Sequence, residues 1–123
     1  MPSDPPRIVV VEDDASMRQA IERMLHAGGF AVVSFASAEA ALKADAAADC
    51  LVLDIYLPGM SGFDLYRRLA RCGKELAVVF ITARDEPAVR EEAESLGGAG
   101  SFLPKPFGGQ VLLDAVARAL RRT

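Results

Sequence analysis

The sequence predicts an α/β domain in which one parallel sheet is covered by helices on both of its faces. Strand-like and helix-like patterns alternate five times along the 123 residues, which is typical of repeated βα units. The strand-like runs at residues 8–11, 51–53 and 77–82 are apolar without alternation, as expected for strands that are buried on both faces. With 51% hydrophobic residues, a chain of this length forms one domain around its own core.

Local start and stop signals place the individual elements. The expected strands are residues 8–11, 31–35, 51–53, 77–82 and 101–103. The expected helices begin near residues 15, 38, 63, 87 and 110. Ser37 is a favoured N-cap for the second helix, which we expect to run to about Ala47, and Pro87 suits the first turn of the fourth. Paired glycines at 28–29 and 97–98 end the first and fourth helices.

Composition and charge exclude several classes of protein. The formal net charge is −3, so nothing global indicates direct binding to nucleic acid. Cys50 and Cys72 have no metal-type spacing and are typical of small apolar residues in a reducing compartment. The apolar runs are too short to span a membrane, and residues 1–6 lack the pattern of a signal peptide. We expect a cytoplasmic protein with a flexible segment at 1–6, one domain at 7–123 and no second domain in this chain.

Polar residues lie at the ends of four of the expected strands. Asp54 and Thr82 end the third and fourth strands. Glu12 and Asp13 follow the first strand, and Lys105 follows the fifth. In an open parallel sheet, ligands bind outside the carboxyl ends of the strands. Carboxylates that converge there repel one another unless a hard cation such as Mg²⁺ joins them, and lysine and threonine suit a phosphoryl group. The set predicts phosphoryl transfer to the Asp54 carboxylate.

Four motifs carry a resemblance to a known family. They are VVVEDDASMR, LVLDIYLPGMSG, VVFITAR and FLPKPF, in this order. Over nearly its full length the chain resembles a response-regulator receiver domain of two-component signalling, and it is similar to receivers of DNA-binding regulators of the FixJ/NarL type. The resemblance implies a flavodoxin-like, doubly wound (βα)5 fold with the strand order 2-1-3-4-5.

The resemblance also implies a metal site. Asp13 and Asp54 would ligate Mg²⁺ (or Mn²⁺) directly, the backbone carbonyl of Tyr56 would be a third protein ligand, and Glu12 would act through water. The spacing from Asp13 to Arg18 sets the register of this acidic cluster. It makes Glu12 and Asp13 the acidic pair and leaves Asp14 outside it.

The same resemblance assigns the phosphorylation residues. Asp54 would accept the phosphoryl group, Lys105 would pair with it, and Thr82 would donate a hydrogen bond to it. Phe102, three residues before the lysine, matches the family's aromatic switch position. Thr82 would move toward the phosphoryl group, Phe102 would turn into the space that Thr82 leaves, and the small Ala83 would give room for this movement.

Several of these residues have plainer interpretations. Asp14 is better explained as the N-cap of the first helix than as a ligand, and His26 fits a structural role at the negative end of the same helix. Phe102 fits the core and the switch equally well. Lys105 alone would be a surface lysine, but prolines flank it. The prolines allow a cis bond between Lys105 and Pro106, and we expect a rigid turn that aims the amine at Asp54.

Two further side chains flank the expected site. Tyr56 lies two residues after Asp54, and Arg84 lies two residues after Thr82. Side chains at these positions border the route by which water would attack a phosphoryl group on Asp54. We therefore predict that Tyr56 and Arg84 together set the lifetime of the phosphorylated form.

The leading interpretation is a signalling switch that catalyses only its own phosphorylation and dephosphorylation. A sensor histidine kinase or a phosphotransfer protein would phosphorylate it, and the fourth helix, fifth strand and fifth helix would form the output surface. That surface would contact a downstream protein or a fused effector domain, and the resemblance allows a phosphorylation-dependent dimer through it. An aspartate-nucleophile phosphatase is disfavoured because position 56 is tyrosine rather than an acid. An inactive binding module is disfavoured because every polar strand-end position holds a functional residue type.

Overall fold

The computed structural model describes residues 4–71 and 76–122, so Cys72 and residues 1–3 of the expected flexible segment lie outside it. The strands are β1 (Arg7–Val11), β2 (Ala31–Phe35), β3 (Cys50–Asp54), β4 (Ala77–Thr82) and β5 (Phe102–Pro104). The helices are α1 (Ala15–Ala27), α2 (Ala38–Ala44), α3 (Gly62–Ala70), α4 (Pro87–Gly97) and α5 (Gly109–Arg122). Strand and helix alternate along the chain as predicted.

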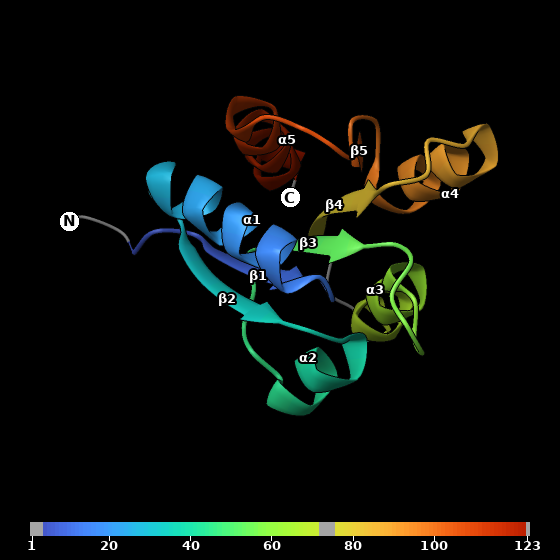
Figure 1. Ribbon diagram of the computed structural model, residues 1–123, viewed down its shortest axis with the longest axis horizontal. Helices are drawn as coiled ribbons and strands as arrows, with labels where there is room; N and C mark the ends of the chain where they lie inside the picture. The colour runs from blue at the N-terminus through green and yellow to red at the C-terminus, as the bar shows by residue number, and fades with distance from the viewer. Residues whose placement is uncertain (1–3, 72–75, 123) are drawn as a thin grey trace.

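All five strands form one parallel sheet in the order β2-β1-β3-β4-β5 (Figure 1). This confirms the expected order 2-1-3-4-5. The register pairs Val11 at the end of β1 with Leu53 of β3, and Asp54 at the end of β3 with Ile81 of β4. The carboxyl ends of the central strands therefore lie side by side at one edge of the sheet.

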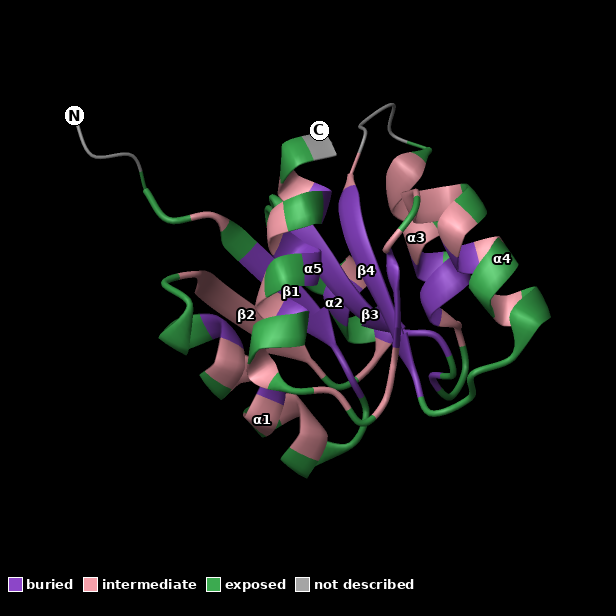
Figure 2. Ribbon diagram, turned by 90° about the horizontal axis from the view of Figure 1, so that it is seen from above, coloured by how far each residue is buried: buried purple, intermediate pink, exposed green. Residues whose placement is uncertain are grey.

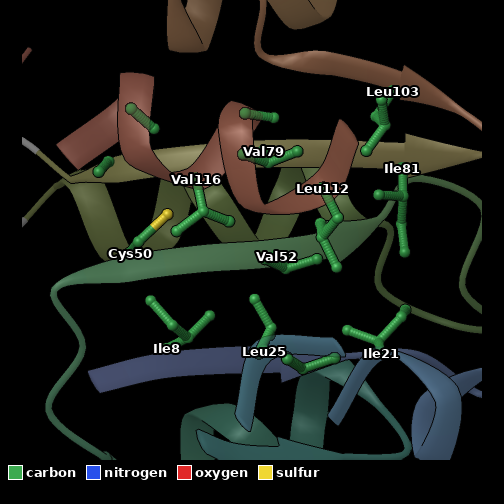
Figure 3. Close-up of a cluster of buried hydrophobic side chains, with 14 residues drawn as sticks. Ile8, Ile21, Leu25, Cys50, Val52, Val79, Ile81, Leu103, Leu112 and Val116 are labelled. Atoms are coloured by element: carbon green, nitrogen blue, oxygen red, sulfur yellow. The ribbon is translucent and has the colours of Figure 1, made fainter. Parts of the chain in front are cut away.

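Alternate residues of the strands serve two separate cores. One core packs strand residues such as Val52 and Val79 against α1 and α5, through Ile21, Leu25 and Leu112 (Figure 3). The other packs the opposite face of the sheet against α2, α3 and α4. Burial on both faces explains why the central strands lack polar alternation, and Figure 2 shows these strands buried between the two helical layers.

Several predicted boundaries need correction, and β1 and β3 each begin one residue earlier than expected. The second helix ends at Ala44 and not near Ala47, because Asp45 takes a left-handed conformation (φ 49°) and its N–H bonds to the Ala41 carbonyl. The alanines beyond that point favour a helix but cannot continue it through a left-handed residue. The fifth strand runs from Phe102 to Pro104, one residue later than expected at each end, although the Ser101 carbonyl still accepts the Phe80 N–H at 2.6 Å. The Ser101 hydroxyl donates to carbonyls in and after α4.

Other local expectations are confirmed. Asp14 is the N-cap of α1, and its Oδ1 accepts the Met17 N–H at 2.8 Å. The Lys105–Pro106 peptide bond is cis, and Cys50 is a buried free thiol. In the described part of the chain, no helix combines the length and the apolar character needed to cross a membrane.

Candidate functional site

The polar residues predicted at the strand ends converge at the carboxyl edge of the sheet. Asp54 is the last residue of β3 and Thr82 the last of β4, while Glu12 and Lys105 directly follow β1 and β5. Three of them are almost fully buried: Glu12 is 1% exposed, Asp54 5% and Thr82 0%. The fold therefore brings together, in a largely enclosed place, residues that are up to 93 positions apart in sequence.

Three carboxylates form the centre of the site. Glu12, Asp13 and Asp54 each offer an oxygen, and these oxygens all lie within 4.8 Å of one another. Glu12 and Asp54 are buried whereas Asp13 is exposed, so the cluster opens toward solvent on the side of Asp13. Carboxylate oxygens are hard ligands of the kind that Mg²⁺ binds, usually together with water and phosphate oxygens. The donor set fits a hard divalent cation.

Lys105 compensates this negative charge. Its Nζ lies 2.5 Å from Glu12 Oε1 and 3.3 Å from Asp54 Oδ2, so the amine points into the site as predicted. The closer partner is Glu12, which sequence reasoning had not paired with the lysine. Burial lowers the pKa of Lys105, but the bond to Glu12 and the charges of Asp54 and Glu12 outweigh it, so this pKa is raised overall.

Glu12 has an unusual protonation equilibrium. Burial raises its pKa from 4.5 to about 7, against the opposing effects of hydrogen bonds from Lys105 and from the Asp14 N–H. The nearby Asp54 carboxylate pushes the pKa in the same direction as burial. Near neutral pH, Glu12 is therefore poised between its protonated and ionised forms.

The backbone around Asp54 is fixed by close packing. Asp54 Oδ1 accepts the Tyr56 N–H at 3.2 Å, and the Ile55 N–H extends the pairing with β4 by donating to Ile81 at 2.9 Å. At the start of α3, a Cβ on Gly62 would lie 2.3 Å from the Asp54 carbonyl oxygen. Only glycine allows the helix to approach Asp54 so closely, which gives the Ser61-Gly62 sequence a structural reason.

The β1–α1 turn has a support that sequence reasoning used only to set a register. Arg18 Nη1 donates to the Glu12 carbonyl at 2.8 Å, and the Glu12 N–H donates to Phe35 of β2 at 3.1 Å. The backbone that carries the acidic pair is thus held from α1 and from β2. Arg18 lies five residues after Asp13, in the first turn of α1. This spacing was the sequence signal from which the contact between Arg18 and the turn could have been predicted.

Tyr56 and Arg84 meet in space. The Arg84 guanidinium lies 4.5 Å from the centre of the Tyr56 ring, which is the geometry of a cation–π contact. The Arg84 N–H also donates to Thr82 Oγ1 at 3.0 Å. The backbone N–H of each residue therefore bonds to a site side chain, while their side chains stack on each other. Sequence reasoning selected both residues but did not predict their contact.

Phe102 lies in the core beneath α4. It is 5% exposed and belongs to the same apolar cluster as Phe80 and Ala93, as the core interpretation predicts; its role as a switch stays a prediction. Sequence reasoning missed Arg90, whose guanidinium lies 4.7 Å from the centre of the Phe102 ring. No sequence pattern predicts this contact, because Arg90 and Phe102 lie on two different elements, α4 and β5, which are separated by a loop.

Comparisons with known proteins agree with this arrangement. The family model described as "Response regulator receiver domain" matches residues 8–117. Nodulation protein W of Bradyrhizobium diazoefficiens is 42% identical over 94% of this chain and 51% of its own length. The transcriptional regulatory protein FixJ of Azorhizobium caulinodans is 35% identical, with 100% and 58% covered. The solved structure of a BeF3-activated DrrB receiver domain matches with a TM-score of 0.82 and 26% identity, covering 96% of this chain and 99% of that one.

The chain spans about half the length of the curated relatives described above. The family match covers nearly the whole fold, including the four strand ends that supply the site. The acids, Thr82 and Lys105 that the family motifs predicted lie at the carboxyl edge of the sheet, whereas Phe102 lies in the core. This chain belongs to the family of response regulator receiver domains.

Proposed function

We propose that this receiver domain is a phosphorylation-driven switch in which Asp54 accepts a phosphoryl group. The observation that carries the proposal is the position of the Asp54 carboxylate, buried beside Glu12 and within 3.3 Å of the Lys105 amine. A nucleophilic carboxylate next to a mobile cation and two further acids is a site for phosphoryl transfer. The donor would be a phosphohistidine of a sensor histidine kinase or phosphotransfer protein, or a small acyl phosphate.

The transfer proceeds by displacement at phosphorus. A carboxylate oxygen of Asp54 forms a bond to phosphorus while the bond from phosphorus to the donor's nitrogen or oxygen breaks, and the electron pair leaves with the donor. Asp13, Asp54 and the Tyr56 carbonyl, with Glu12 through water, would hold Mg²⁺ or Mn²⁺, and the cation would supply positive charge for the phosphoryl oxygens. Lys105 turns from Glu12 toward the phosphoryl group, which carries about two negative charges.

Thr82 is prepared to bond to the phosphoryl group. Its Oγ1 accepts the Arg84 N–H, which leaves the hydroxyl hydrogen available for donation. Movement of Thr82 toward the new charge is then passed to α4, β5 and α5, which would form the output surface. The partner there is a downstream protein, an effector domain or a second copy of the chain, and direct contact with nucleic acid is not part of the proposal. The protein acts as a cytoplasmic switch, not as an enzyme that turns over a separate substrate.

Incubation with Mg²⁺ and acetyl phosphate tests the proposal. We expect one acid-stable, base-labile phosphoryl adduct by intact mass, absent from Asp54→Asn and retained by Asp64→Asn, an exposed aspartate on α3. No adduct on the parent protein would favour a binding module, as would an adduct that survives Asp54→Asn at another residue. Continuous phosphate release much faster than a switch could use would favour a phosphatase.

The Tyr56–Arg84 stack is proposed to protect the phosphorylated form. The two residues border the site, because their backbone N–H groups bond to Asp54 and Thr82. The double variant Tyr56→Ala/Arg84→Ala should shorten the lifetime of the phosphorylated protein, measured as loss of the adduct after the donor is removed. Tyr56→Phe keeps the ring and serves as the control. An unchanged decay in the double variant would refute this role.

A further inference from the structure

One neighbour of the Phe102 ring is a cation. Phe102 is 5% exposed in β5 and belongs to the same apolar cluster as Phe80 and Ala93. The Arg90 guanidinium, from α4, lies 4.7 Å from the ring centre, within the distance at which a cation is attracted to an aromatic face. The Arg90 side chain is 44% exposed. Arg90 therefore joins a ring that is almost fully buried to a side chain that reaches solvent.

A second contact fixes the guanidinium. Arg90 Nη2 pairs with Asp85 Oδ1 at 3.1 Å, and Asp85 lies in the loop between β4 and α4. The neighbouring residue in this loop is Arg84, whose N–H is bonded to the Thr82 hydroxyl at 3.0 Å. Contacts thus connect Thr82 at the candidate site to Phe102 in β5, through the loop and the first turn of α4.

We propose that Arg90 is a positioning residue that holds Phe102 in its buried position, with Asp85 holding Arg90 in turn. The proposal rests on the proposed function, since it names the means by which a change at Thr82 reaches the surface formed by α4 and β5. When Thr82 is drawn toward a phosphoryl group, Arg84 and Asp85 move with it. The Arg90 guanidinium then shifts on the Phe102 ring, and the exposure of that ring changes.

The chain offers a matched control for this contact. Arg67 of α3 lies 6.0 Å from the centre of the Phe63 ring and pairs with Glu92 and with Asp64. It is as exposed as Arg90, at 46%. Arg67 therefore has the same chemistry, an ion-paired arginine over a phenylalanine, without touching Phe102. Loss of Arg67 should leave Phe102 unaffected.

The resting protein provides the first arm of the test. The sequence contains no tryptophan, so Phe102→Trp introduces a single tryptophan at the switch position, and its emission serves as the reporter. Acrylamide quenching of this reporter's fluorescence should increase about twofold when Arg90→Met is added, and less for Asp85→Asn, because an aromatic ring that loses its cation is more open to solvent. Arg67→Met should cause no change, and Arg90→Lys should restore part of the protection. Equal quenching in the Arg90→Met and Arg67→Met proteins would overturn the proposal.

The second arm adds Mg²⁺ and beryllium fluoride, the activator present in the DrrB receiver structure. Activation should change the tryptophan fluorescence of the Phe102→Trp protein, and the change should be the same when Arg67→Met is also present. When Arg90→Met is present instead, at least half of this change should be lost. An equal change in all three would show that the switch operates without Arg90 and would overturn the relay. Hydrogen exchange of the segment 85–103 repeats both arms in proteins that retain Phe102. The amides of this segment should exchange faster in Arg90→Met than in the parent protein, and Arg67→Met should match the parent. Equal exchange rates in Arg90→Met and Arg67→Met would count against the proposal.

The two arms separate this inference from the proposed function. If the parent chain forms no adduct with acetyl phosphate, the proposed function fails, while the quenching of the resting proteins still decides whether Arg90 holds Phe102. If the adduct forms and Arg90→Met behaves like Arg67→Met in both arms, the proposed function stands and the role of Arg90 is wrong.

Discussion

The interior of the sheet and its carboxyl edge differ in what they bury. The interior strands bury apolar residues only, as at Val10, Val52 and Val79, each 0% exposed. The edge buries Glu12, Asp54 and Thr82 to nearly the same extent. Apolar burial is the main favourable contribution to folding, whereas burial of charge opposes folding unless partners compensate it. The interior therefore supplies stability, and the edge uses part of it to hold reactive groups together.

The edge manages its charges within the protein. Among the residues that the structure describes, no buried side-chain nitrogen or oxygen lacks a hydrogen-bond partner. Lys105 serves both Glu12 and Asp54, and backbone N–H groups serve the remaining oxygens of these acids. The compensation is incomplete, as the raised pKa of Glu12 shows. The buried polar groups at the edge therefore all have hydrogen-bond partners, but the burial of their negative charge still opposes folding.

The largest expected effect lies in the interior. Leu112 of α5 is 0% exposed and packs on the α1/α5 face of the sheet, so Leu112→Ala removes apolar contact and leaves a cavity. We expect a loss of about 2–5 kcal/mol in the free energy of unfolding by urea. Val111→Ala, next in sequence but 49% exposed, should change it by less than about 0.5 kcal/mol. Similar losses of stability in the two variants would contradict the claim that the buried interior supplies the stability of the fold.

A smaller effect is expected from Glu12 at the edge. Its pKa is about 7 in the folded protein and 4.5 in its ordinary state, so the folded chain binds this proton more tightly between these two values. The unfolding free energy should therefore fall as the pH rises from 4.5 to 7, by at most about 3 kcal/mol. Urea unfolding across this range, without divalent cations, measures the fall.

Two variants isolate the contribution of Glu12. Glu12→Gln should flatten this part of the pH profile, whereas Glu91→Gln, on the exposed side of α4, should keep it. The raised pKa of Lys105 contributes stability that is lost only above its ordinary value of 10.5, outside the window. If the Glu12→Gln and parent profiles run parallel from pH 4.5 to 7, the charge at the edge carries no such cost.

The same contrast explains what could be predicted from the sequence. Strand order and burial follow from apolar runs, and the site follows from which residue ends each strand, as with Asp54 and Thr82. These features depend on local pattern and on the direction of the strands. The Lys105–Glu12 pair, the Tyr56–Arg84 stack and the Arg90–Phe102 contact depend on side-chain conformations and on distances between separate elements. Sequence spacing does not encode them, so only the structure reveals them.

The smallest effect is expected from adding Mg²⁺ at the edge. A cation that binds only the folded protein stabilises it by about 1.4 kcal/mol at ten times its dissociation constant. The parent protein and Asp64→Asn should both gain this amount in urea unfolding at pH 7.5. The double variant Asp13→Asn/Asp54→Asn should gain almost nothing, because it loses two of the three carboxylates in the cluster. The gain should be smaller at pH 6, where Glu12 is mostly protonated and contributes less negative charge. An equal gain in the double variant would place the cation elsewhere, and the charge at the edge would then remain uncompensated by metal.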